Sequence, residues 1–132
     1  MAGAGAADVA AGIDFALGAG AQVINLSMGA RAGNQTLREA IDRAEAAGVL
    51  VIASAGNAPV HQEMFPAAYP NVLSVTALSQ DGELGYDAAL AEGVDIGATG
   101  ENLVTTLPGD VYCFVSGSSA AAAFASGVAA LC

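Results

Sequence analysis

Basic residues are scarce in this sequence: it contains no lysine, and three arginines stand against 13 acidic residues. The formal net charge of -10 argues against nucleic acid as a partner, because contacts to phosphates need clustered cations. An anionic membrane surface is disfavoured for the same reason. An acidic surface of this kind mainly serves solubility.

Cysteine, histidine and long apolar runs are also rare. Cys113 and Cys132, the two cysteines, fit no metal-ligand spacing, and His61 is the single histidine. No apolar run approaches the ~18 residues of a membrane-spanning helix. Residues 1–5 carry neither the basic region nor the apolar stretch of a secretory signal, so the sequence leaves localisation open.

Small and apolar residues are abundant. Hydrophobic residues make up 55% of the 132 residues, which fits one globular domain over 1–132. Apolar periodicity and glycine stops predict helices over 6–17, 35–47 and 120–131, strands over 23–28, 49–53, 72–78 and 94–98, and a hairpin of 103–106 with 111–115. This order predicts an α/β fold, a parallel sheet flanked by helices in three layers, with a β-hairpin before the last helix.

The polar chemistry gathers in loops that follow predicted strands, where parallel sheets bind their ligands. Ser27 follows the first strand, Asn57 follows the second, and Ser119 precedes the last helix. A serine at a helix start is either an N-cap or a nucleophile whose oxyanion the helix N–H groups stabilise. An asparagine after a buried strand is either a turn residue or an oxyanion donor.

Five ordered segments carry a family resemblance. They are 23–29 (VINLSMG), 46–57 (AAGVLVIASAGN), 65–72 (FPAAYPNV), 106–109 (TLPG) and 117–119 (GSS). Together they resemble the subtilisin-like serine proteases (subtilases, the peptidase S8 family), over the central-to-C-terminal part of the catalytic domain. The resemblance implies a serine endopeptidase and an incomplete subtilisin-like fold.

The resemblance also implies roles for individual residues. Ser119 is expected to be the nucleophile and Asn57 the oxyanion-hole asparagine, with the Ser119 backbone N–H as second donor. An extended peptide is expected to pair with the segment of Ser27, Met28 and Gly29 by β-augmentation. The pocket for the residue before the scissile bond is expected to take its walls from Ala53, Ser54, Ala55, Gly56, Pro66 and Ala67. Ala67 is expected to narrow this pocket, and the Phe65–Pro66 bond is expected to be cis.

The sequence also departs from the family pattern. The family's catalytic Asp and His lie on an upstream portion that has no match here, and its final segment is missing too. His61 is interpreted as a solvated loop residue, because a base must lie within reach of the nucleophile. Ala120, Ala123 and Phe124 replace the Met, Pro and His that usually follow the serine.

These departures predict a partial subtilase domain over 1–132, whose isolated chain is inactive because an unactivated serine is a poor nucleophile. The alternative is a non-catalytic protein that keeps the fold for peptide binding or assembly. No cofactor is expected; the resemblance implies only a weak calcium site at the backbone carbonyls of Ala67, Tyr69 and Val72. The expected partners are a polypeptide substrate, the upstream subtilase segment, and a second copy that pairs with the exposed edge of strand 23–28. Family members are often secreted.

Overall fold

The structure is a computed structural model that describes residues 5–58 and 62–132, and it has a helix or strand at every predicted position. In chain order the elements are α1 (Ala6–Gly18), β1 (Val23–Leu26), α2 (Gln35–Ala46), β2 (Leu50–Ser54), β3 (Leu73–Leu78), β4 (Ile96–Thr99), β5 (Leu103–Leu107), β6 (Val111–Val115) and α3 (Ser118–Ala129).

Some boundaries differ from the prediction by two residues. Strand β1 ends at Leu26, where its parallel pairing with Ala53 of β2 also ends, so Ser27 and Met28 lie in the loop beyond the sheet. Helix α3 begins at Ser118, so Ser119 belongs to its first turn instead of preceding it. Both differences lie near the carboxyl ends of the strands, where the candidate site is.

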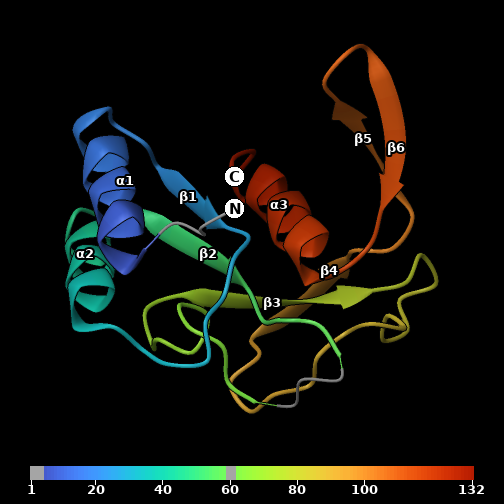
Figure 1. Cartoon of the computed structure of the whole chain (residues 1–132), viewed down its shortest axis with the longest axis horizontal. Helices are drawn as coiled ribbons and strands as arrows, with labels where there is room; N and C mark the ends of the chain where they lie inside the picture. Colours follow the sequence, from blue (N-terminus) through green and yellow to red (C-terminus); the bar gives the residue numbers. More distant parts are fainter. Residues whose placement is uncertain (1–4, 59–61) are drawn as a thin grey trace.

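The sheet has the predicted parallel topology. Its strands follow the order β1-β2-β3-β4, and every neighbouring pair is parallel. Figure 1 shows α1 and α2 on one side of this sheet and α3 on the other, which confirms the three-layer prediction. Strands β5 and β6 form a separate antiparallel hairpin before α3, and Figure 1 shows this hairpin projecting from the rest of the domain.

The core has two halves, one on each face of the sheet. Strand β2 is buried along most of its length, so its residues alternate between the halves: Val51 and Ala53 pack toward α1 and α2, and Ile52 packs toward α3. This explains its continuous apolar run, which is typical of a strand covered on both faces. On the α3 side the packing depends on small side chains, since a Cβ at Gly100 would lie 2.8 Å from the Cβ atoms of Ala77 and Ala121. Close packing of this kind leaves the start of α3 little freedom to shift.

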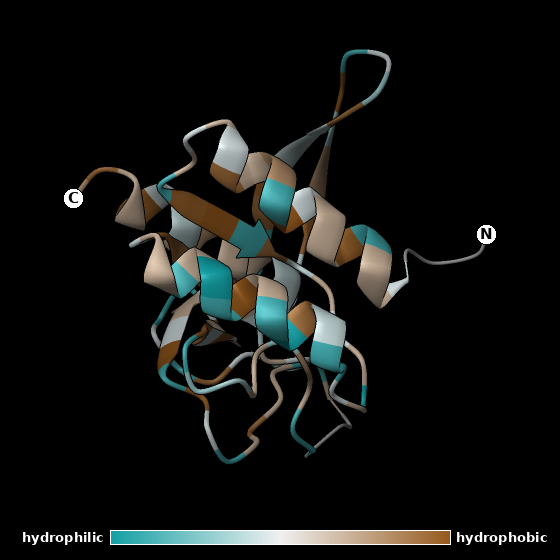
Figure 2. Ribbon diagram, turned by 90° about the vertical axis from the view of Figure 1, so that its left-hand side faces the viewer, coloured by the Kyte–Doolittle hydropathy of each residue, from teal (hydrophilic) through white to brown (hydrophobic). Residues whose placement is uncertain are grey.

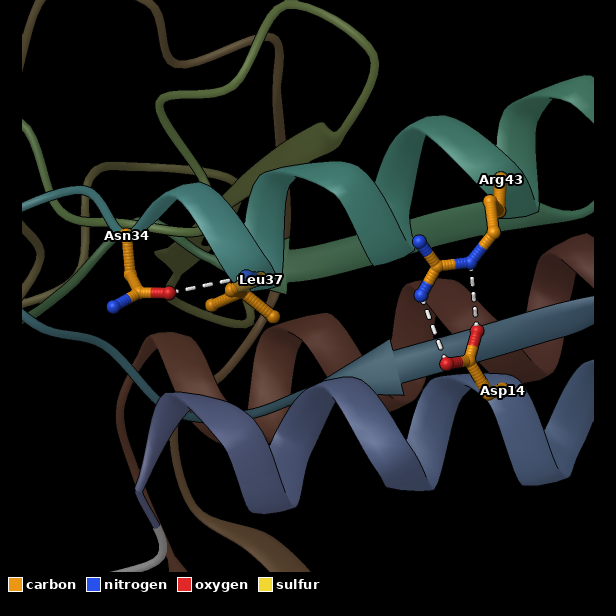
Figure 3. Close-up of polar contacts among 4 residues, drawn as sticks. All are labelled: Asp14, Asn34, Leu37 and Arg43. Atoms are coloured by element: carbon orange, nitrogen blue, oxygen red, sulfur yellow. Dashed lines mark hydrogen bonds and ion pairs between the residues drawn. The ribbon is translucent and has the colours of Figure 1, made fainter.

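Helices α1 and α2 are joined at the surface by an ion pair. The Arg43 guanidinium donates to both carboxylate oxygens of Asp14, at 3.0 and 2.8 Å, and these hydrogen bonds raise the pKa of Arg43 (Figure 3). The Asn34 side chain caps α2 by accepting the Leu37 N–H at 3.2 Å. Figure 2, which looks onto this side, shows hydrophilic residues along α2 and few on α1. Within the residues that the structure describes, no helix is long and apolar enough to cross a bilayer.

Candidate functional site

Ser119 lies in the first turn of α3 and is exposed. Gly117 caps this helix with a φ of 123° and a ψ of 170°, a conformation that only glycine adopts readily. The Ser119 hydroxyl faces the loop after β1, where its Oγ lies 3.5 Å from the Ser27 carbonyl oxygen. A serine hydroxyl is therefore presented beyond the carboxyl ends of β1 and β2.

Asn57 comes from the loop after β2 and is bound to the residue before Ser119. Its Oδ1 accepts the Ser118 backbone N–H at 2.8 Å and the Ser118 hydroxyl at 3.0 Å. A Cβ at Gly117 would lie 3.1 Å from Asn57 Oδ1 and 3.2 Å from Nδ2, so the glycine also makes room for the asparagine. Because Oδ1 is occupied by Ser118, the orientation of the Asn57 amide is fixed.

This arrangement leaves free hydrogen-bond donors at the start of α3. Among the described residues, neither the Asn57 Nδ2 nor the Ser119 N–H has a hydrogen-bond partner. A helix N-terminus also carries a partial positive charge. Donors placed in this way can stabilise a negative oxygen that forms beside the Ser119 hydroxyl.

A second set of hydrogen bonds holds the Ser119 backbone from the side of β1. The Ser27 hydroxyl donates to the Ser119 carbonyl at 2.7 Å, and the Asn25 Nδ2 donates to Ser27 Oγ at 2.9 Å. The Ser126 Oγ lies 3.1 Å from Asn25 Oδ1 and 2.8 Å from the Ala122 carbonyl, which competes for its proton. Sequence reasoning missed the roles of Asn25 and Ser126. These residues are 101 positions apart, and no motif in the sequence indicates that they meet.

The remaining predicted binding residues divide into exposed and buried ones. Ser27, Met28 and Gly29 are exposed beyond β1, and Gly56 is half-buried. The side chains of the other predicted wall residues are buried; these are Ala53, Ser54, Ala55, Pro66 and Ala67. The Phe65–Pro66 bond is cis, as predicted. Backbone hydrogen bonds of 2.8 Å in both directions between Ala30 and Phe65 join this segment to the loop after β1.

An apolar cavity lies beside this joined pair of loops and was not predicted from the sequence. It has a volume of about 320 Å³ and lies between the start of α1, the start of α2 and the Phe65–Pro66 bond. Its lining includes Val9, Met28, Leu37, Phe65 and Pro66. The lining comes from four parts of the chain, namely the start of α1, the loop after β1, the start of α2 and the Phe65–Pro66 segment. This explains why no single motif indicated the cavity.

Metal ligands of the side-chain type are sparse. Within the described part of the chain, no group of three or more His, Cys, Asp or Glu residues could hold a metal ion. Ala67, Tyr69 and Val72, the expected carbonyl ligands, line a cavity of about 150 Å³ together with Glu63 and Asp95. Oxygen donors of this kind suit calcium. The weak calcium site is compatible with this lining and stays a prediction. His61 lies outside the described residues.

The fold is similar to that of solved protease domains. The prenylagaramide maturation protease PagA superposes with a TM-score of 0.92 at 30% identity, covering 99% of this chain and 50% of that one. The patellamide maturation protease PatA gives a TM-score of 0.88 at 31% identity, covering 96% of this chain and 49% of that one. The PatG macrocyclase in complex with peptide gives 0.84 at 26% identity, with 96% and 41% covered. These neighbours define a subtilisin-like protease fold.

The sequence comparison agrees with this class. A sequence profile of the Subtilase family, peptidase S8, matches residues 2–132, and this chain belongs to that family. Alkaline elastase YaB of Bacillus sp. (strain YaB) is 37% identical over 123 residues, which are 93% of this chain and 32% of the relative. Subtilisin Savinase of Lederbergia lenta is 36% identical, over 93% of this chain and 46% of the relative. The chain thus spans between a third and a half of the length of these relatives.

Proposed function

We propose that this chain carries the nucleophile, the oxyanion donors and the peptide-binding edge of a subtilase-type serine endopeptidase. In the proposed reaction the Ser119 hydroxyl attacks a peptide carbonyl and the amine leaves, which gives an acyl-enzyme that water then hydrolyses. The observation that carries the proposal is the convergence of the Ser119 hydroxyl and the Asn57 amide at the start of α3, fixed by the 2.8 and 3.0 Å bonds to Ser118.

The donors at the start of α3 supply the electrostatic part of this mechanism. Attack on the carbonyl carbon places a negative charge on the carbonyl oxygen, and the Asn57 Nδ2 and the Ser119 N–H are free to bind it. Both donors are held before substrate arrives, since Ser118 fixes the amide and the α3 backbone fixes the N–H. Preorganised donors stabilise the transition state without a cost of reorientation at the moment of reaction.

The proposed substrate is an extended polypeptide that lies beside Ser27, Met28 and Gly29. The Ser27 carbonyl, 3.5 Å from the nucleophile oxygen, is an acceptor for a substrate N–H next to the scissile bond. The apolar cavity of about 320 Å³ beside Met28 offers space for an apolar side chain of the same peptide. A structural neighbour, the PatG macrocyclase, has itself been solved in complex with peptide, which supports this class of substrate.

A general base is the element that the proposed site needs from elsewhere. Among the described residues, the Ser27 carbonyl is the only hydrogen-bond partner of Ser119 Oγ, and no carboxylate or imidazole bonds to it. We propose that the base comes from the remaining part of a subtilase catalytic domain, and that this chain alone reacts slowly. The relatives support a larger catalytic unit, since the matched region covers 32% to 46% of their length.

Covalent labelling with a fluorophosphonate tests the nucleophile. We expect slow phosphonylation confined to Ser119, read by intact mass and peptide mapping, and faster phosphonylation when a subtilase segment carrying the catalytic Asp and His is added. Ser119→Ala should abolish it, whereas Ser79→Ala, a serine away from the site, should leave it unchanged. A folded chain that stays unlabelled with and without the added segment would refute the catalytic role.

The free edge of β1 supports a further part of the proposal. Strand β1 is the outer strand of the sheet and, among the residues that the structure describes, pairs only with β2, so its other edge is open there. Open edges of this kind pair with other chains, and we propose that a second copy pairs there when the rest of the domain is not present. Light scattering at high micromolar concentration should show dimers; a monodisperse monomer would contradict this.

A further inference from the structure

The loops after β1 and β2 each carry a glycine whose missing side chain leaves room for the same residue. A Cβ at Gly29 would lie 3.1 Å from the Met64 Cε and 3.5 Å from its Cβ. A Cβ at Gly56 would lie 3.0 Å from the Met64 Cγ. The distances of 3.1 and 3.0 Å are shorter than ordinary carbon contacts. The Met64 side chain therefore contacts the backbones of both loops and lies between them.

Little empty space lies on the side of Met64 that faces Ala55 and Ala67. The cavity lined by Ala55, Met64 and Ala67 has a volume of only about 10 Å³. A void of that size holds one water molecule at most. The apolar cavity beside Met28, at about 320 Å³, is more than an order of magnitude larger. Ala67 also lines the small cavity, yet it is Met64 that reaches both glycines.

We propose that Met64 occupies the pocket for the residue before the scissile bond and restricts that residue to glycine or alanine. This rests on the proposed function, because that pocket lies between Gly29 and Gly56 only if the peptide runs beside Ser27 toward Ser119. A larger side chain at this position has to displace Met64. Methionine has flexible torsions, but here its movement is limited because it contacts backbone on both sides.

The size of the effect follows from packing. Pockets discriminate by about 10–200-fold for each methylene that they exclude or admit. We therefore expect the chain to prefer alanine over phenylalanine before the scissile bond by at least about tenfold. Met64→Ala opens the pocket, and the preference should then fall to within about threefold or reverse in favour of phenylalanine.

Two measurements test this in the chain as it is. The first is the binding of short peptide amides that end in alanine or phenylalanine, followed through the methyl resonances of ¹³C-labelled methionine. The second is labelling of Ser119 by peptidyl phosphonates that carry the same two side chains. Leu84→Ala is the control, because it also truncates a large apolar side chain but lies between β3 and β4, outside the two loops; it should leave the preference between alanine and phenylalanine as it was.

The outcomes separate this inference from the proposed function. Preferential binding of the alanine peptide, with a Met64 methyl shift and loss of the preference in Met64→Ala, supports the inference even if Ser119 is not labelled. Labelling of Ser119 at equal rates by both phosphonates overturns the inference and leaves the nucleophile intact. Binding of neither peptide, or an unchanged preference in Met64→Ala, also overturns it.

Discussion

The Asn57 side chain accepts both hydrogen-bond donors of Ser118, the backbone N–H at 2.8 Å and the hydroxyl at 3.0 Å, across a separation of 61 residues. This contact joins the loop after β2 to the first turn of α3. It satisfies one of the N–H groups that a helix start leaves free, and among the described residues it leaves the Asn57 Nδ2 without a hydrogen-bond partner. One side chain therefore supports the helix and supplies a donor to the candidate site.

Substitutions of Asn57 can separate these two roles. Asn57→Ala removes both, so we expect lower stability, by about 1 kcal/mol, and slower phosphonylation of Ser119. Asn57→Asp keeps the acceptor, and its charge is favourable at a helix start, but it lacks the amide donor. Loss of one such donor in subtilisin, a member of the same family, costs about 10²–10³-fold in rate, and we expect a loss of that order.

Thermal unfolding and the rate of Ser119 labelling should be measured for Asn57→Ala and Asn57→Asp. The aspartate variant should unfold close to the parent chain, whereas the alanine variant should unfold earlier. If the aspartate variant is labelled as fast as the parent chain, the amide is not an oxyanion donor.

Ser27 is expected to hold the nucleophile-bearing turn through its hydroxyl. Ser27→Ala removes the 2.7 Å bond to the Ser119 carbonyl, and a neutral hydrogen bond contributes about 0.5–1.5 kcal/mol. We therefore expect amide hydrogen exchange at the start of α3, followed by NMR, to become about three- to tenfold faster. Ser27→Thr keeps a hydroxyl and should restore slow exchange. Equal exchange in all three chains would show that the bond does not hold the turn.

Gly117 is expected to be intolerant of a side chain for two reasons. Its φ of 123° and ψ of 170° fall in a region that other residues avoid, and a Cβ would lie 3.1 Å from Asn57 Oδ1. Gly117→Ala should lower the free energy of unfolding by about 1–3 kcal/mol. Gly127→Ala is the matched control, because nothing lies within 4 Å of its Cβ position in α3; it should raise stability by about 0.5–1 kcal/mol. Similar destabilisation of both would argue against the described conformation.

Ser79 is a site where an apolar side chain is expected to be better than the native one. Its hydroxyl oxygen is buried and has no hydrogen-bond partner among the described residues. Ser79→Ala removes a desolvated polar group. We therefore expect the free energy of unfolding, measured by denaturant titration, to rise by about 1 kcal/mol. The control is Thr76→Val, which deletes a buried 2.8 Å bond to the Ala89 carbonyl and should lower stability by about 1–2 kcal/mol. Destabilisation by Ser79→Ala would indicate that the hydroxyl is satisfied.

The secondary structure could be read from the sequence because burial follows local periodicity. In α2 the buried residues Leu37, Ile41 and Ala44 recur at helical spacing, and the apolar run of β2 matches burial on both faces. The boundaries near the site were harder to predict. Strand β1 ends where its pairing with β2 ends, and that register is a property of two segments.

The candidate site divides in the same way. Ser119 and Asn57 stand out in the sequence because each follows an apolar segment in a strand-to-loop pattern, and the family resemblance supplies their order. Asn25 and Ser126 carry no such signal, since they meet only when α3 packs against β1. Met64 carries none either, because its position depends on the loops of Gly29 and Gly56.

The sequence by itself determined the α/β class, the family and the two polar residues at the start of α3 and after β2. The tertiary structure decided which atoms meet: the Asn57 Oδ1 with Ser118, the Ser27 hydroxyl with the Ser119 carbonyl, and Met64 with two glycines. The physical reason is the distance along the chain between the residues that interact. Helix and strand patterns arise from neighbours a few residues apart. Parallel strand register pairs residues 21 or 27 positions apart, and the packing of α3 brings together residues that are 61 to 101 positions apart.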